Sequence, residues 1–126
     1  MLVPQLYLNG ACFEAIELYK KAFKTETDSI MYDTQKDPEK FVIHAEMQIL
    51  GTRLMLSDFG GAKESSSDST MEIVAIFENE ELLKEAYRII NDGSKTITPI
   101  GPIFFSPCLV SFIDKFGVRW CFMVQV

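Results

Sequence analysis

The 126-residue chain has few cysteines and no long apolar run. Its cysteines, Cys12, Cys108 and Cys121, are odd in number and show no Cys-x-x-Cys spacing, which argues against a disulfide framework and for a reducing compartment. No run of about 20 apolar residues is present, so we expect no membrane-spanning segment. The opening residues lack the basic and apolar regions of a secretory signal. We therefore expect a cytoplasmic protein.

The common catalytic motifs are absent as well. The sequence contains no P-loop, no GxSxG, no HExxH and no Ser/His/Asp arrangement. The turn at residues 8–11 has one glycine, whereas an adenosyl cofactor normally needs a glycine-rich turn between a strand and a helix. We therefore expect no bound cofactor. His44 is the only histidine, so any acid–base chemistry that uses an imidazole has to use this residue.

Positive charge is in short supply. The formal net charge is -6, which steers the protein away from nucleic acids and from anionic membrane surfaces. Hydrophobic residues make up 48% of the chain, which is enough for a core at this length.

Apolar spacing and turn residues predict the same order of elements twice. In the first half we expect a strand over 2–8, a helix over 12–23, a strand over 27–32, a loop over 33–40, and hairpin strands over 41–50 and 52–58. In the second half we expect a strand over 70–77, a helix capped by Asn79, a strand over 95–98, a loop over 99–102, and hairpin strands over 108–113 and 118–126. The prediction is one α+β domain, residues 1–126, of two βαβββ half-modules (1–58 and 69–126) joined by a linker (59–68), with a cupped mixed sheet and the helices on its outer face.

The second helix is expected to bury one apolar stripe and to end near a glycine. Gly93 suits the left-handed conformation that ends many helices. The stripe is Leu82, Leu83, Ala86, Ile89 and Ile90.

The alternation of residues 41–49 gives the sharpest site signal, because strand side chains alternate between two faces. The apolar set, which we expect to face a helix, is Phe41, Ile43, Ala45, Met47 and Ile49. The other set is Val42, His44, Glu46 and Gln48. His44 and Glu46 are two residues apart on one face, so their Cα atoms lie about 7 Å apart and both could contact one ligand or water. The polar face could also be a solvated edge or a dimer interface.

Neighbouring strands supply further candidates. Over 52–58 one face carries Arg53, Met55 and Ser57, and we place Met55 and Ser57 in the cavity because Leu54 and Leu56 suit the core. On the first strand we place Gln5 and Tyr7 in the cavity. Asp58 ends its strand and is expected to cap a turn. The aromatic loop expected over 104–107 could close over a ligand or cover the core.

Three segments together resemble a known family. They are YLNGACFEAIELYKKAF at 7–23, FVIHAEMQILGTRLMLSD at 41–58 and SFIDKFGVRWCFMV at 111–124. In this order they resemble the vicinal oxygen chelate superfamily, which includes glyoxalase I, bleomycin-resistance proteins and ring-cleaving dioxygenases, and within it the PhnB-like branch.

The resemblance implies paired βαβββ modules around one cavity and a homodimer. Metal-using members carry a His or Gln and a Glu from each half. Here these positions fall on Gln5 or Pro4, near Met55, near Glu72 and on Cys121, a poor ligand set, so we expect no intact metal site. The resemblance also makes Cys121, and Phe105 where the branch often has Trp, candidate ligand contacts.

Two functions from different classes follow. The first is a protein that binds a small organic ligand in a cavity, without a metal and without turnover. The second is an enzyme of the lyase, isomerase or dioxygenase type that acts on a small carbonyl or aromatic substrate. In that enzyme His44 would be the acid or base and Glu46 would fix its tautomer.

Overall fold

The computed structural model describes residues 1–33, 35, 40–63, 66 and 68–125. The chain divides into two compact units, residues 1–63 and 64–126, and each unit is considered by itself. Parts of the expected loop over 33–40, of the linker over 59–68 and of the last strand fall outside the described residues. No helix in the described part of the chain is long and apolar enough to cross a membrane.

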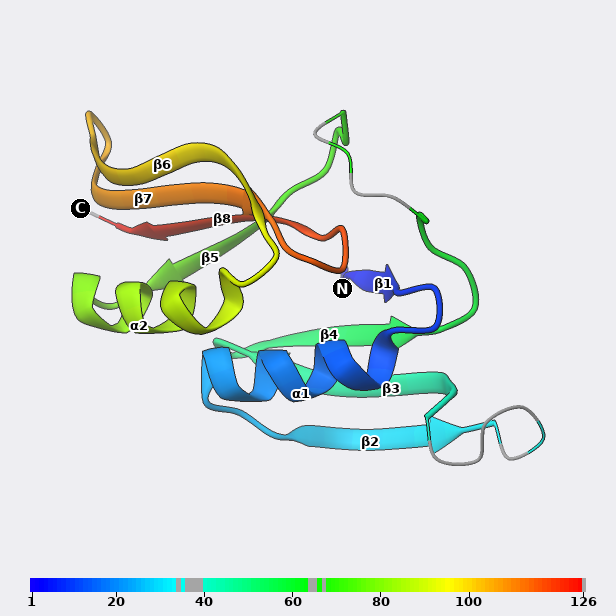
Figure 1. Ribbon diagram of the computed structural model, residues 1–126. Coiled ribbons are helices and arrows are strands. Elements are labelled where there is room, and N and C mark those ends of the chain that lie inside the picture. The colour runs from blue at the N-terminus through cyan, green and yellow to red at the C-terminus, as the bar shows by residue number, and fades with distance from the viewer. Residues whose placement is uncertain (34, 36–39, 64–65, 67, 126) are drawn as a thin grey trace. The chain divides into compact units, whose positions relative to one another are not determined.

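The first unit is a four-stranded mixed sheet with one helix packed on it (Figure 1). In the sheet the strand order is β1-β4-β3-β2, with β1 parallel to β4 and the other pairs antiparallel. The elements are β1 (Gln5–Tyr7), α1 (Cys12–Phe23), β2 (Thr27–Tyr32), β3 (Val42–Ile49) and β4 (Thr52–Ser57).

The second unit repeats this topology, with strand order β5-β8-β7-β6 and β5 parallel to β8. Its elements are β5 (Ile73–Phe77), α2 (Glu80–Ile90), β6 (Lys95–Ile103), β7 (Ser106–Ile113) and β8 (Arg119–Val124). The predicted α+β class with two βαβββ modules is therefore confirmed, as two four-stranded sheets. A cup and cavity shared by both modules stay predictions.

Both helices form where the sequence places them. The helix over 12–23 has the predicted bounds, and Asn79 caps α2 by accepting a hydrogen bond from the backbone N–H of Leu82. The expected buried stripe of α2 was wrong at Leu82, which is exposed, and Ile89 is only partly buried. The buried residues Leu83, Ala86 and Ile90 follow the spacing of one helix face together with Tyr87, at i, i+3, i+7 and i+4. The ring centroid of Tyr87 lies 5.1 Å from that of Phe112.

The carboxylate of Asp58 joins three elements at one end of the first unit. Its Oδ1 accepts a hydrogen bond from the backbone N–H of Cys12, the first residue of α1, and its Oδ2 accepts one from the backbone N–H of Val42, the first residue of β3. The side chain is almost completely buried. Two charge-assisted bonds to buried donors make this residue a structural anchor, and its role extends beyond the predicted turn cap.

A β-bulge at Ile43 breaks the alternation predicted for β3. Met31 pairs with His44 while Tyr32 pairs with Val42, so Ile43 is an extra residue. Val42, predicted on the polar face, is therefore fully buried, and Ile43, predicted to face the helix, is only partly buried. From His44 to Ile49 the predicted alternation holds, with Ala45, Met47 and Ile49 buried.

The predicted loop over 99–102 was wrong, because β6 runs on through Pro99 and Pro102 to Ile103. Its pairing with β7 shifts register three times, between Thr96 and Ile103. β6 lies at the edge of its sheet, where a proline without an N–H removes no ladder bond on the outer side. The first strands of both modules are shorter than predicted, since β1 begins at Gln5 and β5 at Ile73.

Gly60 and Gly61, at the start of the expected linker, make close contacts with the end of β1 and the residues that follow it. The carbonyl of Gly60 accepts a hydrogen bond from the N–H of Asn9 at 2.7 Å. Gly61 has φ of 115°, and a Cβ there would lie 2.4 Å from the carbonyl oxygen of Tyr7. Only glycine fits so close to that backbone.

We predict that Asp58→Asn lowers the free energy of unfolding by about 2–4 kcal/mol, because the amide nitrogen cannot accept from a buried N–H and the charge assistance is lost. Urea denaturation followed by circular dichroism measures the change. Asp28→Asn, at an exposed position of β2, is the matched control and should change stability by less than about 0.5 kcal/mol. Equal stability of the two variants would contradict the anchoring role.

Candidate functional site

The sheet of the first unit turns one face away from the α1 side, and we call this the open face. Residues that pair across strands share a face, and alternate residues along a strand share a face. Gln5 pairs with Met55, and Met55 pairs with Glu46. The residues of the open face are Gln5, Tyr7, Ser29, Met31, His44, Glu46, Gln48, Arg53, Met55 and Ser57.

This register brings together six of the eight residues predicted to form a site: Gln5, Tyr7, His44, Glu46, Met55 and Ser57. Their opposite neighbours, such as Ala45, Leu54 and Leu56, are buried on the helix side. The faces that the sequence predicts for these residues of β1, β3 and β4 therefore agree with the register.

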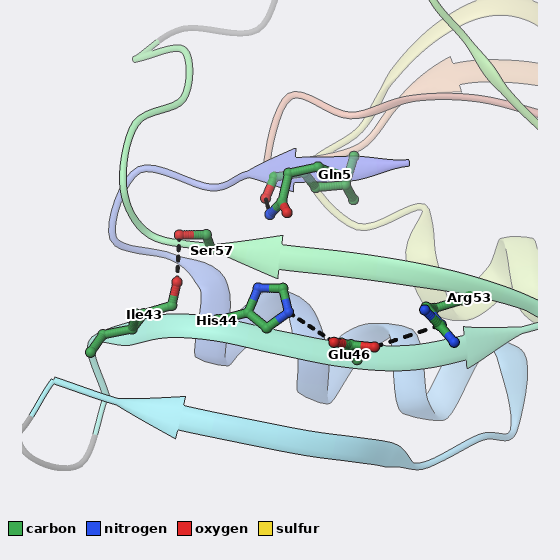
Figure 2. A network of polar contacts seen from close by, with 7 residues as sticks. Gln5, Ile43, His44, Glu46, Arg53 and Ser57 are labelled. Atoms are coloured by element: carbon green, nitrogen blue, oxygen red, sulfur yellow. Dashed lines mark hydrogen bonds and ion pairs between the residues drawn. The ribbon is translucent and has the colours of Figure 1, made fainter. Parts of the chain in front are cut away.

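A chain of polar contacts crosses the open face (Figure 2). Nε2 of His44 lies 3.0 Å from Oε2 of Glu46, and Oε1 of Glu46 lies 3.6 Å from Nε of Arg53. The side chains of His44 and Glu46 are 36% and 28% exposed, so the pair is partly shielded from water. One carboxylate thus contacts both an imidazole and a guanidinium.

The contact with Glu46 fixes which nitrogen of His44 carries the proton. A carboxylate accepts hydrogen bonds and cannot donate them, so Nε2 is the donor. In the neutral ring the lone pair is then on Nδ1, which no side chain of the described residues engages. This nitrogen can accept a proton or a hydrogen bond from a bound molecule.

Gln5 and Met55 lie beside this pair. The amide of Gln5 makes one long hydrogen bond, 3.5 Å from its Nε2 to the carbonyl oxygen of Leu6, so most of its bonding capacity is unused. Met55 is partly buried between Gln5 and Glu46 and supplies an apolar surface. Tyr7 is 54% exposed at the end of β1.

Ser57 is on the predicted face, but its hydroxyl serves the fold. The side chain is buried, its Oγ donates to the carbonyl oxygen of Ile43 at 2.8 Å, and it accepts from the N–H of Phe59. Figure 2 shows the bond to Ile43, which closes the strand pair at the bulge. Because its hydroxyl is engaged within the fold, Ser57 could contact a ligand only through its small surface.

Phe105 and Cys121 belong to the second unit. Phe104 and Phe105 form the turn between β6 and β7, where Phe104 is 96% exposed and the two rings are 5.0 Å apart. This loop does not cover the core of its own unit. Cys121 is buried in β8 beside Val74 and Ser111.

The residues at the metal positions implied by the resemblance do not fit a divalent ion. Met55 offers a thioether, and Glu72 is engaged by Nε of Arg119 at 3.0 Å. Burial, and secondarily the charge of Glu72, raises the pKa of the Cys121 thiol to about 11, so it stays protonated and is a poor ligand. In the described residues no group of three or more His, Cys, Asp or Glu side chains is placed to hold a metal ion.

Arg53 is the functional candidate that sequence reasoning passed over. It was assigned to the same face as Met55 and Ser57, but a charged residue two positions after a turn is usually a solvated one. What identifies Arg53 is its position diagonally opposite Glu46 in the β3–β4 hairpin. This relation is known only once the register of the hairpin is known.

A second buried carboxylate explains the third segment of the resemblance. Oδ1 of Asp114 accepts from the N–H groups of Phe116 and Val118, and its Oδ2 accepts from Nε1 of Trp120 at 2.9 Å. The segment at 114–120 is therefore a structural turn that anchors the buried indole within the second unit.

Solved structures share this fold over the whole chain. A PhnB protein from Bacillus cereus is 24% identical, with 98% of each chain covered and a TM-score of 0.84. Protein PA1353 from Pseudomonas aeruginosa is 24% identical, with 99% of this chain and 97% of that chain covered and a TM-score of 0.82. A glyoxalase/bleomycin resistance protein/dioxygenase from Alicyclobacillus acidocaldarius is 11% identical, with 99% and 90% covered and a TM-score of 0.68.

Neither a protein-family model nor a curated protein matches the chain. The structural matches therefore confirm the resemblance at the level of the fold. The chain has the fold of PhnB-like proteins and of the glyoxalase/bleomycin resistance/dioxygenase proteins.

The three thiols should be unreactive in the folded protein. Burial, and secondarily Asp58, raises the pKa of Cys12 from 9.0 to about 12, and burial also raises the pKa values of Cys108 and Cys121. We predict slow labelling by a disulfide reagent at pH 8 and labelling of all three thiols in concentrated urea.

The same shifts predict a loss of stability in alkali. Above pH 9.0 the unfolded thiols ionise while the folded thiols hold their protons, so the stabilisation present below pH 9.0 is lost as the pH rises towards about 12. Urea midpoints between pH 7 and pH 11 test this, and Cys12→Ala should flatten the decline. An equal decline for Cys12→Ala and the unchanged protein would contradict this prediction, and fast labelling of the native protein would contradict the prediction of unreactive thiols.

Proposed function

We propose that this chain is a PhnB-like member of the vicinal oxygen chelate superfamily that binds a small organic ligand on the open face of its first sheet, without the metal of the superfamily. His44 and Glu46 would be the central polar contacts. Gln5, Tyr7 and Met55 would line the rest, and Ser57 would add a small surface.

The observation that carries the proposal is the His44–Glu46 contact at 3.0 Å on a face with partly buried, unengaged groups. An imidazole oriented by a carboxylate beside an apolar thioether and a nearly free amide suits a ligand with both polar and apolar parts. A strand face that only meets water gains little from such an arrangement, since an exposed ion pair contributes about 0–1 kcal/mol.

Metal-independent binding is proposed because the donor chemistry is poor. Met55 and the protonated Cys121 thiol replace the carboxylates that the resemblance leads one to expect. The ligand contacts expected at Phe105 and Cys121 stay predictions.

A second candidate function is supported by the orientation of His44. With Nε2 held by Glu46, Nδ1 is the basic nitrogen and could abstract a proton from a small carbonyl or aromatic substrate. The second candidate is therefore an enzyme of the lyase, isomerase or dioxygenase type. We further propose a cytoplasmic homodimer, supported by the resemblance and by three free, buried thiols.

The test is a thermal-shift screen of the purified protein against a metabolite library. We predict that some compounds bind the native state preferentially and so raise Tm. At a concentration 100 times Kd, such a compound raises the free energy of unfolding by about 2.7 kcal/mol. His44→Ala and Glu46→Gln should remove these shifts, whereas Glu81→Gln on the exposed side of α2 should keep them.

Dialysis against EDTA distinguishes metal-independent ligand binding from metal-dependent ligand binding. We expect unchanged ligand shifts and no stoichiometric metal in the protein as isolated. Loss of binding after chelation, or binding that survives both His44→Ala and Glu46→Gln, would overturn the proposal. Turnover of a bound carbonyl compound that His44→Ala abolishes would favour the enzyme.

A further inference from the structure

Arg53 has hydrogen-bond donors on the open face that no described residue engages. Only its Nε is directed at Glu46, at the long distance of 3.6 Å, and the side chain is 45% exposed. The two terminal nitrogens of its guanidinium make no hydrogen bond to any described residue. Figure 2 shows Arg53 at the end of the polar chain, on the side of Glu46 away from His44.

The charges of the cluster leave a place for an anion. The carboxylate of Glu46 is shared between His44 and Arg53, and among the described residues no other acidic side chain pairs into the open face, although the exposed Asp28 lies unpaired at a bulge of β2. The remaining members of that face are neutral. The charged group with unused hydrogen bonds in this cluster is therefore a cation, and the carboxylate of the cluster, Glu46, is already engaged.

The register sets what lies next to this donor. Arg53 precedes Met55 by two residues on β4, so about 7 Å separates their Cα atoms on one face, and Met55 pairs with Gln5 on β1. Arg53, Met55 and Gln5 thus present a planar cation, an apolar surface and an amide in succession. A guanidinium binds a carboxylate through two parallel hydrogen bonds, which a lysine cannot do.

We propose that the ligand of this face is a small organic acid whose carboxylate binds the terminal nitrogens of Arg53, whose apolar part lies over Met55 and whose hydroxyl bonds the amide of Gln5. The inference rests on the proposed function, because it names the chemical class of ligand for the same face. It makes Arg53 the residue that determines specificity.

Three probes of one shape test the class. Mandelate carries a carboxylate, mandelamide replaces it with a neutral amide, and 2-amino-1-phenylethanol replaces it with an ammonium group. Isothermal titration should give the tightest binding for mandelate, by about tenfold over the amide. Binding of mandelate should weaken as salt rises, because the contact is between charges.

Substitutions then assign the effect to Arg53. Arg53→Gln should remove the advantage of mandelate over mandelamide, Arg53→Lys should retain part of it, and Arg88→Gln on the exposed side of α2, which changes the net charge equally, should leave it intact. Thermal melts of each variant check that the fold is kept.

The failures are distinguishable. Equal binding of acid and amide, tighter binding of the amine, no binding of mandelate, or an advantage that survives Arg53→Gln overturns the inference. Binding of the amide or amine that depends on His44 leaves the proposed function standing. Absence of any ligand in the library screen overturns the proposed function itself.

Discussion

The first unit depends on the carboxylate of Asp58. It holds the first N–H of α1 and the first N–H of β3, and the backbone N–H of Asp58 returns a hydrogen bond to the carbonyl oxygen of Val42. The start of β3 is therefore fixed against both the helix and the end of β4. With Val42 held inward, the bulge at Ile43 resets the alternation, and His44 and Glu46 face away from the helix. The candidate site follows from this anchor, although Asp58 is not part of it.

The two units share a topology but differ in the chemistry of their open faces. In the first unit this face carries an imidazole, a carboxylate, a guanidinium and an amide. In the second unit the corresponding face carries the apolar Val74 and Met123, the thiol of Cys121 and the guanidinium of Arg119, whose Nε lies 3.0 Å from Oε2 of Glu72. Each unit also closes a strand pair with a buried serine, since Ser106 donates to the carbonyl oxygen of Val124 as Ser57 donates to that of Ile43. The repeat thus preserves structural devices, while the imidazole and its carboxylate partner belong to the first sheet.

Much of the fold and part of the site could be predicted from the sequence. Period 3.6 set the helix over 12–23, and period 2 set the faces of His44, Glu46 and Met55, because these residues lie in regular stretches. The bulge at Ile43 and the passage of β6 through Pro99 and Pro102 could not be predicted, since both depend on register with a neighbouring strand. The same is true of Arg53, whose relation to Glu46 is diagonal across a hairpin. The hydroxyl of Ser57 was assigned to the correct face, but its engagement by Ile43 depends on the bulge.

The contact between His44 and Glu46 carries the functional argument, and the single histidine makes it directly observable. Long-range proton–nitrogen correlation spectra of uniformly ¹⁵N-labelled protein report which ring nitrogen is protonated, free of overlap from other imidazoles. At a pH where the ring is neutral, we predict one tautomer with the proton on Nε2 and the lone pair on Nδ1. A proton on Nδ1, or the averaged nitrogen shifts of a freely exchanging imidazole, would contradict the oriented pair.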